Sequence, residues 1–295
     1  MAVIAPSDFR KRMARRKWRG RVFYGMCLLA VGIALAMLAV LLVYIVAQGW
    51  SRVSWSFLTS FPSRHPDRAG IQAALLGSIY LVTVAGVASF VLGVGAAIYL
   101  EEYAARSRFA RIVQINISNL AGVPSIVYGI LGLQVFVRSM DLGKSVLAGG
   151  LTLALLILPI IIIAAEEAIR AVPPSLREGA FGLGATRWQT IWHLVLPQAF
   201  PGILTGVILA VSRAIGETAP LIAMGALTFV PFAPDGLLSR FTALPIQIFN
   251  WTSRPQAGFH EAAAAGIIVL LVALVIMNGA AVIVRNKFQG PNVGC

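Results

Sequence analysis

Two residues of opposite charge, Arg213 and Glu217, lie in an otherwise apolar stretch of the sequence. They are four positions apart, so in a helix their side chains share one face. An ionisable residue at membrane depth costs at least about 2.5–3.5 kcal/mol, and such residues usually face a partner, a cavity or a pathway. One interpretation is a neutralised pair that only stabilises helix packing. The other is a gate in an anion pathway, because a guanidinium is always charged and binds oxyanions through two donors.

In the gate hypothesis, Glu217 holds Arg213 while no anion is present and repels an anion that remains beside it. Thr218 is the third candidate for the translocation pathway. Gly216 and Pro220 are candidate hinge residues, because both residue types give a helix local freedom.

A second informative segment, residues 166–197, is amphipathic and lies between two apolar runs. Pro173-Pro174 predicts the end of one helix. Ser175 is followed three residues later by Glu178, which is a capping-box pattern and predicts that a new helix starts there.

This short helix is predicted to end at about Leu183, since Gly184 suits a left-handed C-terminal turn. Thr186 is then expected to cap a second short helix over residues 187–195, which Leu196-Pro197 closes. The segment therefore predicts helix, turn, helix on one face of the protein.

Small residues in this segment allow a partner to approach closely. Phe181 and Trp188 offer apolar anchors of the kind enriched in binding hot spots, and Glu178 could pair with a basic residue of the partner. The alternative is a surface helix that merely caps the bundle. The small residues are Gly179, Ala180, Gly182, Gly184 and Ala185.

The composition indicates what surrounds these segments. Of 295 residues, 58% are hydrophobic and 12% charged, whereas a soluble domain is about half apolar and a quarter charged. A membrane span needs about 20 mainly apolar residues, and Pro124 is expected to kink the third run. The sequence predicts an all-α membrane protein with about six transmembrane helices, at Val22–Gln48, Gln72–Leu100, Ile112–Val137, Val146–Ala165, Gly202–Thr228 and Ala262–Val284.

The basic residues predict the topology. Eight of the 24 Lys and Arg lie between Arg10 and Arg21, and a basic block beside a span is a signal for topology and anionic lipid, not for nucleic acid. Outside the spans, 16 Lys and Arg fall on the side that holds both termini and 7 on the other. The positive-inside rule therefore predicts cytoplasmic termini.

Two segments resemble known phosphate-binding or metal-binding motifs, but each lacks a required residue. Gly143-Lys144-Ser145 lacks the first glycine of a phosphate-binding loop, since position 138 is Arg138. His260-Glu261 lacks the second histidine of a zinc-protease motif, because Ala264 stands there. The two cysteines build no disulfide framework or metal site. We expect no catalytic residues, no metal site and no cofactor bound by this chain.

The segment before the fifth run resembles the coupling loop of ABC import permeases, which has a second alanine where this chain has Gly179. The run from Arg213 to Pro220 is similar to that of phosphate permeases of the PstA type, although their PstC-type partners carry a similar Gly-Glu-Thr. The coupling loop resemblance rests on Glu178, Ala180, Gly184, Leu194, Leu196 and Pro197.

The resemblance implies a type I ABC importer permease fold with a cytoplasmic coupling helix. It further implies a phosphate-translocating subunit in a bacterial inner membrane, paired with a PstC-like permease. Two PstB-like ATPases would bind ATP and Mg, and a PstS-like protein would deliver phosphate from outside. The implied ATPase-coupling residues are Glu178, Gly179, Ala180, Gly184, Leu194, Leu196 and Pro197.

Three alternatives stay open. The substrate could be another oxyanion such as sulfate or molybdate, the chain could work alone as a channel or a membrane-embedded enzyme, or it could be a scaffold that signals phosphate status. The expected organisation is a basic cytoplasmic segment (1–21), a first span (22–48), a permease core (70–287) that includes the coupling loop (166–197), and a tail (288–295).

Overall fold

The computed structural model describes residues 6–104, 107–226 and 229–288. Within these ranges the chain is helical, and its extended pairing is limited to a single bridge between Ser145 and Arg240. Five helices are long and apolar enough to cross a membrane, and a bent pair makes six if it counts as one span. This confirms the expected all-α membrane fold.

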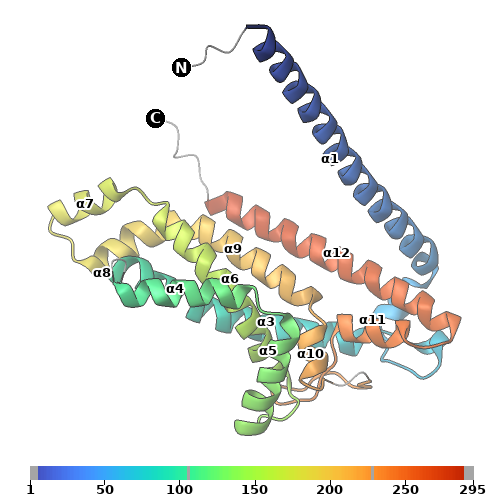
Figure 1. Cartoon of the computed structure of the whole chain (residues 1–295). Coiled ribbons are helices and arrows are strands. Elements are labelled where there is room, and N and C mark those ends of the chain that lie inside the picture. Colours follow the sequence, from blue (N-terminus) through green and yellow to red (C-terminus); the bar gives the residue numbers. More distant parts are fainter. Residues whose placement is uncertain (1–5, 105–106, 227–228, 289–295) are drawn as a thin grey trace.

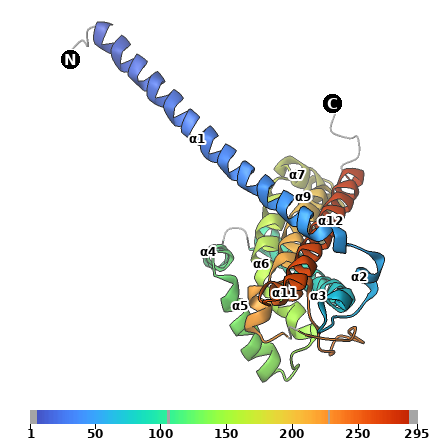
Figure 2. The ribbon, with the colours of Figure 1, turned by 90° about the vertical axis from the view of Figure 1, so that its right-hand side faces the viewer.

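The helix α1 (Pro6–Gly49) stands apart from the rest of the molecule. It contacts α12 (Ala257–Phe288) near its own C-terminal end and otherwise projects away from the bundle (Figures 1 and 2). Its apolar side chains from Val22 to Tyr44 are exposed, as expected of a helix whose solvent is lipid. The described part of the basic segment belongs to the same helix, so no structural break separates it from the first span.

The core of the bundle is formed by α3 (Gln72–Ile98), α6 (Val146–Arg170) and α9 (Leu196–Gly216). Leu81, Ile157 and Ile161 are fully buried at the centre of one apolar cluster. Because α6 packs against α3, α4, α5 and α9, two-thirds of its most apolar stretch is buried inside the protein.

The third predicted span is broken rather than kinked, which corrects the expectation of one helix over Ile112–Val137. The helix α4 (Arg108–Ala121) meets α5 (Ser125–Gly132) and its π-helical extension Leu133–Ser139 at an angle of 102°. Pro124 adopts an extended backbone, with φ −55° and ψ 135°, and it has no N–H to continue the hydrogen-bond ladder. Pro124 thus marked the correct position in the sequence. The change of direction there is larger than the proline kink that was expected.

The fifth predicted span, Gly202–Thr228, is also wrong in its limits. The helical path starts at Arg187, runs through the π-helical turn Ile191–Val195 into α9, and ends at Gly216. A short helix, α10 (Ala219–Ala223), follows the break. Residues 227–228 lie outside the described residues.

The other elements complete one face of the bundle. Short segments follow α1, namely the 3₁₀ turns Trp50–Arg52 and Pro66–Arg68 and the helix α2 (Trp55–Thr59). The helix α11 (Leu244–Thr252) packs on α12, and Trp251 and Phe259 are buried between them.

The coupling segment and the chain's end share one end of the bundle. The helices α7 (Pro174–Gly182) and α8 (Arg187–Thr190) lie at the same end as the C-terminal end of α12 (Figure 1).

Candidate functional site

The charged pair lies at the C-terminal end of α9. The Nε atom of Arg213 donates to Oε1 of Glu217 at 3.2 Å. The Arg213 side chain is 46% exposed and that of Glu217 is 18% exposed. The Arg213 side chain is therefore accessible from the surface of α9, whereas most of the Glu217 side chain is covered by protein.

Glu217 is not on the helix, contrary to the simple picture of two residues on one helical face. Its backbone is extended, with φ −77° and ψ 120°, and its N–H donates to the carbonyl of Ala214 at 3.3 Å. Non-helical backbone at membrane depth is tolerated where it is buried in protein or lines a water-filled cavity. The free backbone groups at the break at Glu217 and Thr218 therefore need partners from protein or water.

The two candidate hinge residues lie on opposite sides of this break. Gly216 is the last residue of α9, and a side chain added there would meet open space. Pro220 lies in the first turn of α10 and is buried. Of the two hinge candidates, Gly216 therefore has space around it, whereas Pro220 is packed against its neighbours.

The helix α10 is held by the other broken span. A Cβ atom added to Gly129 of α5 would lie 2.4 Å from the carbonyl oxygen of Pro220, so the two backbones are in contact. Next to Gly129, the hydroxyl of Tyr128 donates to the carbonyl of Leu120 at 2.8 Å, across the break between α4 and α5. The sequence analysis missed both residues. The one local signal in the sequence was that both residues lie close to Pro124. Nothing in the sequence indicated the contact between Gly129 and α10.

In the coupling segment, the predicted cap of α7 is wrong. The residue at the N-cap is Pro173, Pro174 is the first helical residue, and no side chain caps this end. The fixed φ of proline suits the first helical position, where a missing N–H costs nothing. The helix thus starts one residue before Ser175, which leaves no Ser175–Glu178 capping box.

The predicted turn after α7 is confirmed. Gly184 has φ +84°, and its N–H donates to the carbonyl of Phe181 at 3.0 Å. The N–H of Ala185 donates to the carbonyl of Ala180, also at 3.0 Å. This pair of bonds is a Schellman motif, in which a residue without a Cβ is strongly preferred at the left-handed position.

The predicted cap of the next helix is confirmed, but its predicted end is not. Thr186 and Gln189 form a reciprocal capping box at the start of α8. Leu196-Pro197 does not close the helix, since the N–H of Leu196 bonds to the carbonyl of Ile191 and the chain continues into α9. The wider π turn lets the helix pass a residue that lacks an N–H.

The segment presents an apolar surface with a hollow. Phe181, Trp188 and Trp192 are exposed, and Leu183 is 92% exposed. A hollow of about 460 Å³ lies between α7 and the π turn, beside Gly184 and Leu194. Glu178, Gly179 and Pro197 are exposed, whereas Ala180, Leu194 and Leu196 are half-buried. The sequence analysis did not single out Leu183 and Trp192.

Comparison with known proteins agrees with this geometry. Residues 89–290 match the family described as "Binding-protein-dependent transport system inner membrane component". The chain belongs to this family. It is therefore a multi-pass membrane transport subunit.

Three relatives illustrate the similarity. A probable ABC transporter permease protein, YqgI of Bacillus subtilis, is 33% identical over 90% of this chain and 95% of its own length. The phosphate transport system permease protein PstA 1 of Mycobacterium tuberculosis is 32% identical over 95% and 93%, respectively. The PstA protein of Mycobacterium leprae is 36% identical over 84% and 83%.

Solved structures show the same fold at low sequence identity. A chain of the inward-facing MetNI methionine ABC transporter has a TM-score of 0.60 and 17% identity, over 73% of this chain and 94% of its own. A chain of a bacterial ABC transporter for the acidic polysaccharide alginate has a TM-score of 0.60 and 17% identity, over 92% and 98%. The type I ABC importer permease fold is therefore correct for this chain.

Proposed function

We propose that this chain is the phosphate-translocating permease subunit of an ATP-driven importer. The observation that carries the proposal is the Arg213–Glu217 pair, which stands where α9 breaks. Substrate identity is supported by relatives that match almost the whole chain and are phosphate transport permeases.

Arg213 is the residue proposed to bind phosphate. Its guanidinium is half exposed and already oriented by one bond to Glu217. Phosphate would compete with the carboxylate for the guanidinium donors and form the stronger, bidentate contact. The carboxylate then stays nearby as a repelling charge, which favours release of the anion once the pathway opens to the other side. Thr218 lies at the same break and completes the proposed pathway.

The hinge role is assigned differently to the two candidates. Gly216 is proposed to absorb backbone rotation at the end of α9, because no neighbour would contact a side chain there. Pro220 is proposed to keep α10 packed on Gly129 while α9 moves.

Energy enters through the coupling segment in this proposal. The exposed apolar residues of α7 and the hollow beside Gly184 form the surface offered to a cytoplasmic ATPase. Two PstB-like subunits would bind ATP and Mg and hydrolyse the nucleotide, so that this chain is not itself an enzyme. A PstC-like permease would supply the other half of the pathway, and a PstS-like protein would deliver phosphate.

The proposed topology has both termini in the cytoplasm of a bacterium. It is supported by the excess of Lys and Arg on that side and by the shared position of α7 and the end of α12. Single cysteines introduced at Trp18 and Trp55 test it in a background without native cysteines. An impermeant thiol reagent on whole spheroplasts is expected to label only position 55.

The deciding experiment is phosphate-dependent ATP hydrolysis in proteoliposomes that contain the full complex. Wild type is compared with Arg213→Gln, and Arg285→Gln at the end of α12 removes an equal charge away from the break. We expect phosphate-loaded binding protein to stimulate wild type and the control but not Arg213→Gln. Stimulation by sulfate or molybdate instead of phosphate would overturn the substrate. Full stimulation of Arg213→Gln would overturn the pathway role.

A further inference from the structure

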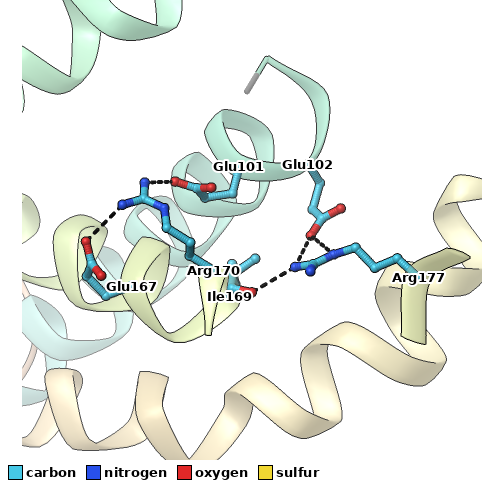
Figure 3. A network of polar contacts seen from close by, with 6 residues as sticks. All are labelled: Glu101, Glu102, Glu167, Ile169, Arg170 and Arg177. Carbon is cyan, nitrogen blue, oxygen red and sulfur yellow. Dashed lines mark hydrogen bonds and ion pairs between the residues drawn. The ribbon is translucent and has the colours of Figure 1, made fainter. Parts of the chain in front are cut away.

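A cluster of charged side chains joins α7 to the ends of α3 and α6 (Figure 3). Glu101 and Glu102 lie in the π-helical turn Tyr99–Tyr103 that extends α3. Arg170 ends α6, and Arg177 lies on α7. The cluster therefore connects three elements at the end of the bundle that carries the coupling segment.

Arg177 makes the most bonds in this cluster. Its Nε and Nη2 atoms donate to Oε1 of Glu102 at 3.1 Å and 3.0 Å. Its Nη2 also donates to the carbonyl of Ile169 at 2.8 Å, and its Nη1 donates to that of Val172 at 2.6 Å. One guanidinium thus contacts the π turn that extends α3 through a carboxylate, and the end of α6 and the chain that follows it through two main-chain oxygens.

The Arg177–Glu102 pair is sheltered from water. The two side chains are 19% and 10% exposed, respectively. Exposed ion pairs contribute little because water and salt screen them, whereas breaking a largely buried pair leaves an uncompensated charge and is costly. Removal of either partner is therefore expected to leave the other charge unpaired in sheltered surroundings.

No residue of α7, which the structure describes in full, is buried. The contact of α7 with the rest of the bundle therefore buries little apolar surface. The bonds of Arg177 are the polar connection that fixes this helix against α3 and α6.

Arg170 provides a contrast within the same cluster. It pairs with Glu101 and, at 3.0 Å, with Glu167, and its side chain is 52% exposed. These bonds connect α6 to α3 and to itself, and none of them reaches α7. Arg170 is thus chemically matched to Arg177 but not attached to the coupling helix.

We infer that Arg177 is a positioning residue that passes displacement of α7 to α3 through Glu102. The inference rests on the proposed function, in which an ATPase moves α7. A helix fixed by two directional bonds to a carboxylate cannot slide past it without breaking them. Since α3 packs on both α6 and α9, a shift at Glu102 reaches the helix that carries Arg213.

The test uses the full complex in nanodiscs with Arg177→Gln, Glu102→Gln and the control Arg170→Gln. The first readout is the number of phosphate ions transported per ATP hydrolysed, normalised to assembled complex. We expect this ratio to fall about fivefold or more for the first two variants, which corresponds to losing about 1 kcal/mol of coupling. The control is expected to keep the wild-type ratio. Arg177→Lys keeps one charge and is expected to fall between wild type and Arg177→Gln.

The second readout does not depend on the substrate. Amide hydrogen exchange of residues 174–182 is expected to accelerate in Arg177→Gln and Glu102→Gln but not in Arg170→Gln. If the wild-type complex transports no phosphate, the proposed function fails while the exchange comparison still tests the attachment of α7.

Two results would overturn the inference. An unchanged ratio in both Arg177→Gln and Glu102→Gln would show that the pair transmits nothing. Loss of the ATPase from both complexes would show that the pair is needed for docking and not for transmission.

Discussion

The carboxylate of Glu217 and the guanidinium of Arg213 remain bonded at 3.2 Å although α9 ends between them, at Gly216. The pair spans the end of a helix and the extended residue that follows it. Rotation of the backbone at the break therefore changes the distance between the two charges directly. In the function proposed above, this change in distance would couple a conformational change to the affinity of Arg213 for an anion.

Glu217→Gln removes the internal competitor for Arg213. We expect the apparent KM for phosphate to fall by up to roughly fivefold, because a partly exposed ion pair contributes no more than about 1 kcal/mol. The maximal transport rate is also expected to fall, since nothing helps to release the anion. Uptake kinetics in proteoliposomes measure both quantities. A pair that only stabilises packing would leave KM unchanged.

Gly184→Val places a β-branched residue at φ +84°. Such a backbone conformation costs a residue with a side chain about 1–3 kcal/mol, so the turn between α7 and α8 is expected to rearrange. Recovery of the ATPase on affinity-tagged permease should decrease. Gly184→Asn is the matched control, because asparagine tolerates the left-handed region. Equal recovery for both variants and wild type would favour the interpretation that α7 merely caps the bundle.

Gly129→Ala adds a methyl group 2.4 Å from the carbonyl oxygen of Pro220 and 2.7 Å from the Cβ of Ala223. Because the closest atom is backbone, α5 and α10 must separate, and overpacking of this kind costs about 1–3 kcal/mol. Thermal unfolding in detergent should occur at a lower temperature. Gly95→Ala on α3 meets open space and is expected not to lower the unfolding temperature, because alanine favours a helix more than glycine does. A neutral Gly129→Ala would mean that the two short helices are not in fixed contact.

Tyr128→Phe deletes the hydroxyl that donates to the carbonyl of Leu120 at 2.8 Å. We expect a loss of about 0.5–1.5 kcal/mol in the free energy of unfolding, because the bond between α4 and α5 disappears. Denaturant titration in mixed micelles measures it. Tyr80→Phe removes the hydroxyl of an exposed tyrosine on α3 and serves as the control. Identical midpoints for the two variants would contradict a role for this bond in holding the bend.

The features that sequence determined are those fixed by local rules. Long apolar runs predicted about six spans because a helix needs a set length to cross the hydrocarbon. The turn at Gly184 and the cap at Thr186 were predictable because each depends on one residue type and its near neighbours. The residues of the charged pair were also recognisable, since charge is rare at membrane depth.

Tertiary structure decided what those rules could not. Prolines at positions 124, 197 and 220 look alike in sequence, yet one marks a bend of 102°, one lies in a continuous helix and one lies in the first turn of a packed short helix. Which outcome occurs depends on whether neighbouring elements satisfy the freed backbone groups. The bond between Arg177 and Glu102 joins residues 75 positions apart. Only the packing of α3, α6 and α7 brings these two charges together, because no local pattern relates them.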